Sequence, residues 1–102
     1  MPRLLTAQEI ERKLRGHQGW RRQGRFITKT FEFDEFMDGI GFIERVAKVA
    51  EGLNHHPDIH VRYTSVTFKL QTHSEGGVTE WDFELAKAID GIGLMGTGKV
   101  AS

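Results

Sequence analysis

The sequence predicts one α+β domain, in which a four-stranded antiparallel sheet carries its helices on one face. Three segments show helix signals, with apolar residues spaced by three and four, and the segments between them show strand signals in two pairs. Their order along the chain is helix, strand, strand, helix, strand, strand, helix. At 102 residues the chain is long enough for one modest core, so we expect a single domain over residues 1–102 that gains from association.

The first helix is predicted to begin after Thr6 and to end near Gly16. Thr6 and Glu9 have the spacing of a capping box, in which each side chain satisfies the free backbone N–H of the other residue. Ile10 and Leu14 follow at a spacing of four, as one face of a helix requires. The signal for the start of this helix is therefore stronger than the signal for its length.

Two strands are predicted next, with a turn at Gln23-Gly24 between them. The second strand covers residues 25–33 and alternates apolar with polar side chains, as a half-buried strand requires. Its apolar side holds Ile27, Phe31 and Phe33, and its polar side holds Thr28, Thr30 and Glu32. Lys29 interrupts the apolar side, so we expect it near an edge of the sheet.

The longest helix is predicted from Asp34, as its N-cap, to about Leu53. Its first apolar stripe, expected to face the sheet, consists of Phe36, Ile40, Ile43, Ala47 and Ala50. A second stripe beside it consists of Phe42, Val46, Val49 and Leu53. Because one sheet-facing seam does not need both stripes, we expect the second to pack against another copy of the chain, in a homodimer or homotetramer.

The third and fourth strands are predicted to pair as a hairpin through the short connection Thr64-Ser65. Both alternate apolar with polar residues, with Ile59, Val61 and Tyr63 on the apolar side of the third and Val66, Phe68 and Leu70 on that of the fourth. Pro57 ends the preceding helix, because proline donates no N–H and restricts the residue before it. The hairpin would bring Thr72-His73 back beside His55-His56-Pro57.

The last helix is predicted to open at Thr79-Glu80-Trp81-Asp82, with Asp82 placed to cap it and to complement its dipole. Its apolar face is expected to consist of Trp81, Leu85, Ala88 and Ile92. The tail over residues 93–102, which contains Gly96 and Gly98, is expected to be loosely ordered.

The composition narrows the classes of partner and site. Fourteen basic residues balance fourteen acidic ones, so the net charge gives no reason to expect direct binding of nucleic acid or of an anionic membrane. The absence of cysteine excludes disulfides, cysteine zinc sites and thiol nucleophiles. No stretch approaches the roughly 20 apolar residues of a membrane span, and the first residues lack the apolar run of a signal peptide. We expect a soluble cytoplasmic protein with a small ligand.

His55, His56 and His73 are the candidate chemical groups. An imidazole with an unperturbed pKa of about 6.5 can give and take protons near neutral pH, and the predicted hairpin brings all three together. A zinc site of these histidines with Asp82 is an alternative. Adjacent histidines rarely face one ion, however, and no His-x3-His pair falls on a helix here, so we predict no metal.

A longer pattern contains these histidines: Glu51-x3-His55-His56-Pro57-x5-Tyr63-x9-His73-x8-Asp82. It resembles the signature of the pterin-4a-carbinolamine dehydratases without a mismatch, and the order of elements is also similar over nearly the whole chain. The resemblance implies removal of water from 4a-hydroxytetrahydropterin to give quinonoid dihydropterin, a step in tetrahydrobiopterin recycling. It implies no cofactor, because the pterin is the substrate.

The resemblance also implies roles for individual residues. His55 and His56 would act as the acid–base pair, with His73 positioning the hydroxyl or sharing the proton transfer. The pterin would contact two segments, which consist of His55, His56 and Pro57 and of Thr72, His73, Ser74 and Glu75. Glu51 and Asp82 would support the histidines, although Glu51 could also be a solvated carboxylate and Asp82 only a helix cap. His17 and His60 are expected at the surface.

A second function belongs to a different class. Members of the family that this chain resembles can stabilise the dimers of a transcription factor through helix packing. The wide apolar surface expected on residues 34–53 could serve a partner's helix in the same way. This interaction-module alternative predicts binding that depends on Phe42 and Val49 but not on His56.

Overall fold

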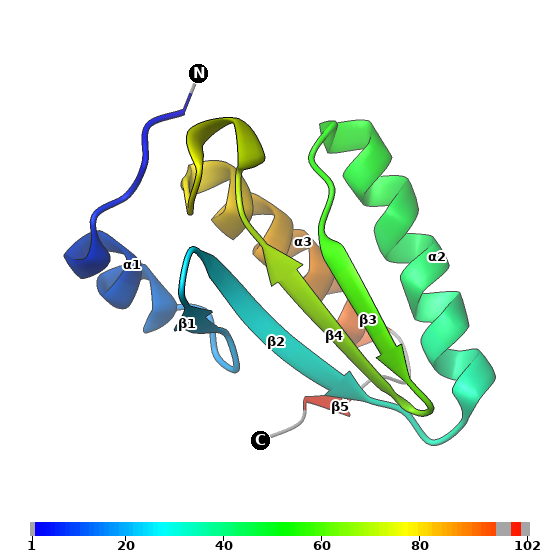
Figure 1. Ribbon diagram of the computed structural model, residues 1–102. Helices are drawn as coiled ribbons and strands as arrows, with labels where there is room; N and C mark the ends of the chain where they lie inside the picture. Colours follow the sequence, from blue (N-terminus) through cyan, green and yellow to red (C-terminus); the bar gives the residue numbers. More distant parts are fainter. Residues whose placement is uncertain (1, 96–98, 101–102) are drawn as a thin grey trace.

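The computed structural model describes residues 2–95 and 99–100, and it shows one layer of helices behind one sheet (Figure 1). The elements follow the predicted order. They are α1 (Ala7–Leu14), β1 (Arg21–Gln23), β2 (Phe26–Glu32), α2 (Phe36–Leu53), β3 (Asp58–Arg62), β4 (Ser65–Leu70), the short 3-10 helix η1 (His73–Glu75), α3 (Glu80–Met95) and β5 (Lys99–Val100). None of the helices in the described part of the chain is long and apolar enough to cross a membrane.

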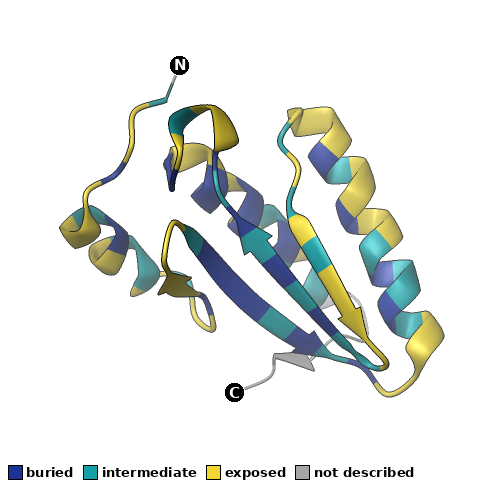
Figure 2. Ribbon diagram, in the orientation of Figure 1, coloured by how far each residue is buried: buried dark blue, intermediate teal, exposed yellow. Residues whose placement is uncertain are grey.

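The sheet has the strand order β1-β2-β4-β3, and every pairing is antiparallel. The predicted hairpin of β3 and β4 is confirmed, with Ile59 opposite Phe68 and Val61 opposite Val66. Strand β3 forms one edge of this sheet and is largely exposed (Figure 2). The hairpin returns the chain to the end of the sheet at which α2 finishes, so the segments before β3 and after β4 lie at the same end (Figure 1).

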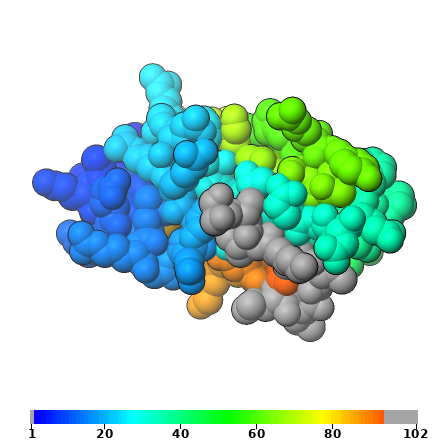
Figure 3. Space-filling model, turned by 90° about the horizontal axis from the view of Figure 1, so that it is seen from below, coloured from blue at the N-terminus to red at the C-terminus, as the bar shows by residue number. Residues whose placement is uncertain are grey.

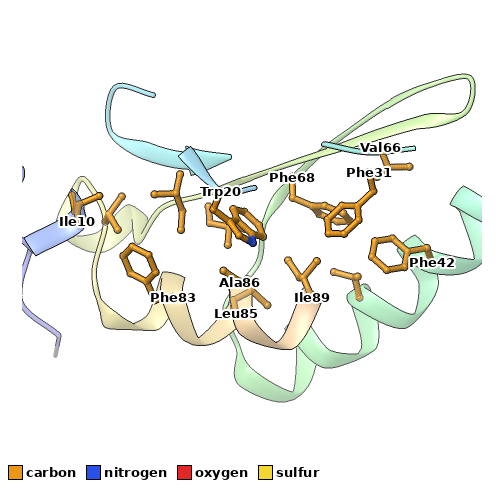
Figure 4. Close-up of a cluster of buried hydrophobic side chains, with 14 of the residues drawn as sticks. Ile10, Trp20, Phe31, Phe42, Val66, Phe68, Phe83, Leu85, Ala86 and Ile89 are labelled. Atoms are coloured by element: carbon orange, nitrogen blue, oxygen red, sulfur yellow. The ribbon is translucent and has the colours of Figure 1, made fainter. Parts of the chain in front are cut away.

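The hydrophobic core lies between the sheet and the helices α2 and α3 (Figure 4). Phe31 of β2, Phe68 of β4 and Phe42 of α2 are buried and contact one another through ring centroids 5.0–5.9 Å apart. Ile10 of α1 joins the core at one end, where Thr6 and Glu9 form the predicted capping box. The aromatic contacts are what fix α2 against the centre of the sheet.

The core faces of both long helices differ from the prediction. In α2 the buried residues are Gly39, Phe42, Val46 and Ala50. Phe42 and Val46, which were expected to face another copy of the chain, therefore face the sheet instead. In α3 the core face includes Phe83, Leu85, Ala86 and Ile89, while the side chain of Trp81 is 42% exposed. Spacings of three and four fit two adjacent apolar stripes on a helix equally well, so only tertiary packing determines which stripe is buried.

Lys29 was wrongly expected near an edge. It lies in β2, which pairs with β1 on one side and β4 on the other, and it is only 5% exposed. Its Nζ lies 2.7 Å from Asp90 Oδ1 and donates to the backbone oxygen of Gln18 at 2.9 Å, while Trp20 Nε1 donates to Asp90 Oδ2. A buried ammonium group is tolerated here because a carboxylate and a carbonyl replace its water.

Three local predictions are also corrected. The N-cap of α2 is Glu35 rather than Asp34. Tyr63 has a φ of 51° in the turn after β3 and is 76% exposed, so it does not lie on the apolar side of the strand. The expected loose tail contributes residues 93–95 to α3 and residues 99–100 to β5, while residues 96–98 and 101–102 lie outside the described residues.

Gly93 explains why α3 runs further than expected. A Cβ at this position would lie 3.2 Å from a ring carbon of Phe31, which is closer than most real Cβ contacts. The glycine therefore lets the end of α3 approach β2 closely, and it does not end the helix. A glycine can end a helix or can allow two elements to approach closely, and the sequence alone does not distinguish these roles. The end of the helix was therefore predicted too early.

Replacing Lys29 by Met should lower the free energy of unfolding by about 3 kcal/mol, because Asp90 loses its cationic partner inside the protein. The double variant with Asp90→Asn should be more stable than Lys29→Met alone, since the amide keeps an acceptor for Trp20 and removes the unpaired charge. Urea unfolding measures both. Lys48→Met is the control, because Lys48 and Glu44 form an exposed pair at 3.6 Å that contributes under about 1 kcal/mol. A double variant less stable than the single variant would contradict this account.

Candidate active site

The backbone turns at the end of α2 and leads directly into the candidate site. Asn54 has the left-handed backbone angles φ 51° and ψ 43°, and its N–H donates to the carbonyls of Ala50 and Glu51. The N–H of His55 also donates to Ala50, at 3.1 Å. Asparagine is one of the few residues that adopts this conformation readily. The turn brings His55, His56 and Pro57 to the end of the sheet, directly ahead of β3.

Asp82 is the residue on which the candidate site is assembled. Its side chain is fully buried, and its Oδ1 lies 2.6 Å from Nε2 of His55, whose side chain is 11% exposed. Its Oδ2 accepts hydrogen bonds from the hydroxyl of Thr72 and from the backbone N–H of Thr79, both at 2.9 Å. One carboxylate thus joins the start of α3, the segment after β4 and the segment before β3.

The hydrogen bond to Asp82 also determines which ring nitrogen of His55 is free to contact a ligand. With Nε2 facing the carboxylate, the other ring nitrogen, Nδ1, makes no hydrogen bond within the part of the chain that the structure describes. No buried polar side-chain atom in that part lacks a partner, so Nδ1 reaches the surface. A carboxylate bonded to one nitrogen fixes the orientation of the ring. The other nitrogen is then available for proton transfer.

Glu51 and His56 form a second carboxylate–imidazole pair. Glu51 Oε2 bonds to Nε2 of His56, and both side chains are exposed, His56 by 55% and Glu51 by 75%. Glu51 lies on the last turn of α2, five residues before His56. The two histidines therefore have the same kind of partner in different surroundings, one buried and one in contact with solvent.

The segment after β4 forms a compact loop. A bridge between Thr72 and Gly77 closes it, and Gly76 has a φ of 75°, which favours glycine. Thr72 is buried, whereas His73 and Ser74 are exposed and Glu75 is partly so. The structure brings Thr72 and His55 to the same carboxylate, and it places His73 next along the chain at the surface.

Two residues at the site were predicted only as parts of the last helix and not as site residues. Thr79, fully buried, exchanges a hydrogen bond of 2.6 Å with Thr72 and caps α3, and its spacing of three from Asp82 is a capping signal that could have found it. Trp81 lies edge-on to the ring of His55, with centroids 5.9 Å apart. It borders a hollow of about 270 Å³ lined by Leu53, Asn54, His55, Trp81 and Glu84.

The site therefore contains two imidazoles that are bonded to carboxylates, those of His55 and His56. A third imidazole, that of His73, lies on the loop that begins at Thr72. Such groups can donate and accept protons at neutral pH without a redox or covalent step. Within the described residues, no group of three or more His, Asp or Glu side chains is arranged to hold a metal ion.

A comparison of the sequence with models of protein families identifies the family of this chain. Residues 3–92 match the model of a family described as pterin 4 alpha carbinolamine dehydratase. The chain belongs to this family. Relatives provisionally named pterin-4-alpha-carbinolamine dehydratase include a protein of Mycobacteroides abscessus, 48% identical over 85% of this chain and 93% of the relative, and one of Roseiflexus castenholzii, 48% identical over 90% and 99%.

Solved structures of the pterin dehydratase family share the fold. A transcriptional coactivator/pterin dehydratase from Brucella melitensis has a TM-score of 0.83 and 38% identity, covering 87% of this chain and 97% of that chain. A pterin dehydratase-like protein, described as a RuBisCO assembly factor in the alpha-carboxysome, has a TM-score of 0.63 and 26% identity over 74% and 90%. The fold is thus found with more than one described role.

Replacing Asp82 by Asn should lower the free energy of unfolding by about 2–3 kcal/mol, because the change removes the charge that accepts three hydrogen bonds in a buried place. Glu51→Gln is the matched control and should change stability by under about 1 kcal/mol, since its pair with His56 is exposed. Urea unfolding measures both variants. Equal losses in the two would show that Asp82 does not organise the site.

Proposed function

We propose that the protein is an enzyme, a hydro-lyase that removes water from 4a-hydroxytetrahydropterin and gives quinonoid dihydropterin, as part of tetrahydrobiopterin recycling. Family membership supports the substrate class. The single observation that supports the chemistry is the buried contact between His55 and Asp82, which leaves one ring nitrogen at the surface. A carboxylate-backed imidazole is a suitable proton acceptor or donor in a reaction of this type.

The reaction needs one proton to be given and one to be taken. The hydroxyl on carbon C4a leaves as water when an acid protonates it, while a base removes the proton from nitrogen N5 and the electron pair forms the C4a–N5 double bond. We propose that His55 and His56 supply this acid–base pair and that His73 positions the hydroxyl or shares the transfer. We propose that the reaction uses no metal or other cofactor, because two imidazoles can supply both proton transfers.

The pterin would be held by the two segments that Asp82 joins. One is His55-His56-Pro57 and the other is the loop containing Thr72, His73, Ser74 and Glu75. A pterin ring has amide-like donors and acceptors, which main-chain groups of a loop can match. The exposed positions of His73 and Ser74 suit a substrate that enters from solvent.

His55→Ala and His56→Ala should each slow dehydration by roughly 10²-fold or more, until the rate approaches that of the spontaneous reaction. Stopped-flow absorbance on enzymatically generated 4a-hydroxytetrahydropterin measures the rate. His60→Ala is the matched control, because His60 is an exposed histidine in β3, opposite Thr67, and it should keep the wild-type rate. Full activity in both the His55 and the His56 variants would refute the proposal.

A second candidate role is protein–protein interaction through α2, and the observation favouring it is an exposed apolar surface at the two ends of this helix. Phe36 is 43% exposed, Met37 67% and Leu53 48%. Leu53 belongs to the stripe that was expected to make such a contact, whereas Phe42 of that stripe is buried in the core and Val49 is only partly exposed. We propose that a second copy of the chain covers this exposed surface in a homodimer or homotetramer. The alternative occupant is a partner protein's helix, as in an interaction module or coactivator.

Met37→Glu should shift the sedimentation coefficient towards that of a monomer, because it places a charge in an apolar contact. Lys48→Glu on the same helix is the control, because Lys48 is exposed and polar already, and it should leave the assembly unchanged. A wild-type protein that sediments as a monomer at all concentrations would exclude self-association. Capture of a partner protein that depends on Met37 but not on His56 would then favour the interaction module.

A further inference from the structure

The basic residues of this neutral chain are unevenly distributed. Residues 1–25 contain seven of the fourteen basic residues but only two of the fourteen acidic ones, Glu9 and Glu11. Residues 2–25, which include α1 and β1, lie at one end of the molecule (Figure 3). Since the dehydratase chemistry proposed above uses the carboxylate-rich site around Asp82, it gives no reason for this concentration of cations.

Three of these cations meet in one hollow. It measures about 470 Å³ and is lined by Ala7, Gln8, Glu11, Arg12, Arg15 and Arg22. Arg12 and Arg15 come from the last turn and the C-cap of α1, and Arg22 comes from β1. Three arginine residues from two elements of structure therefore line a single depression that is open to solvent.

The arginines around this hollow are not used elsewhere in the described residues. Arg3 is paired with Glu9 and Lys13 with Glu80, whereas the side chains of Arg12 and Arg15 make no ion pair or hydrogen bond within the described residues. Arg22 donates from Nε to the backbone oxygen of Gly24, which fixes its side chain and leaves its other donors for a ligand. Like charges that line one depression repel one another, and a bound anion would offset that repulsion.

We propose that this hollow, the arginine hollow, binds the phosphate chain of a small ligand that carries a diphosphate or triphosphate group. The forked guanidinium group matches phosphate oxygens with two parallel hydrogen bonds. No aromatic side chain lines the hollow to stack on a base, so the recognised chemistry is the phosphate chain itself. Glu11 is the one carboxylate in the lining and lowers the net charge there from +3 to +2.

Isothermal titration of the full chain with inorganic pyrophosphate, and separately with a nucleoside triphosphate, tests the proposal. Pyrophosphate should bind with a Kd of about 1 mM or tighter, and the affinity should fall as salt is raised. A similar affinity for both ligands would show that the protein contacts only the phosphate chain and not the nucleoside. A ligand bound only as the nucleoside triphosphate would overturn this reading, as would binding of single-stranded RNA without binding of pyrophosphate.

The variants Arg12→Gln, Arg15→Gln and Arg22→Gln should each weaken pyrophosphate binding roughly tenfold, whereas Glu11→Gln should strengthen it. Arg62→Gln, at an exposed position of β3 away from the hollow, is the matched control and should bind normally. Because all of these side chains are exposed, thermal unfolding should be unchanged, and the dehydration rate should be too. Equal weakening by Arg62→Gln, or no binding by the wild type at millimolar pyrophosphate, would overturn the proposal.

Discussion

The buried carboxylate of Asp82 is the interaction on which the rest of this site depends. A charge removed from water is costly unless its oxygens are satisfied, and here three donors from three separate segments satisfy them. Each segment is held at the end of the sheet by a different part of the fold: the end of α2, the end of β4 and the start of α3. The same bonds that stabilise the fold therefore position His55.

This arrangement links folding and chemistry in one residue. As a cap, Asp82 accepts the N–H of Thr79 and begins α3; as an orienting group, it holds Nε2 of His55. The second pair, His56 with Glu51, lies in solvent and contributes little to stability. One imidazole is thus fixed by the interior of the protein, while its neighbour is exposed to solvent. This difference suits the acid–base pair that we propose.

Much of the fold could be predicted from the sequence because short-range signals, such as capping residues and apolar periods, determine these elements. The capping box at Thr6 and Glu9 and the hairpin of β3 and β4 were both expected and both form. The order of the elements followed from changes in apolar period. The site segments could be placed together for the same reason, since a hairpin must return the chain to its starting end.

The errors arose where tertiary contacts decide. Lys29 has the apolar parity of its strand, but only the approach of Asp90, sixty-one residues away, makes a buried ammonium group acceptable. Phe42 and Val46 were assigned to the wrong side of α2, because the sequence holds two apolar stripes and the aromatic cluster with Phe31 and Phe68 selects one. For Asp82 the sequence left two roles open, a helix cap and a support for the histidines. Its contact with His55 depends on how α3 is docked.

The uneven placement of charge has a consequence for the protein in solution. Residues 1–25 carry seven basic and two acidic residues, a net charge of +5, and the remaining 77 carry seven and twelve, a net charge of −5. A molecule that is neutral overall is thus a large electric dipole. In dilute buffer such dipoles attract one another end to end, and dissolved ions weaken that attraction. The protein should therefore become more soluble as moderate salt is added, because the ions screen the attraction between the oppositely charged ends.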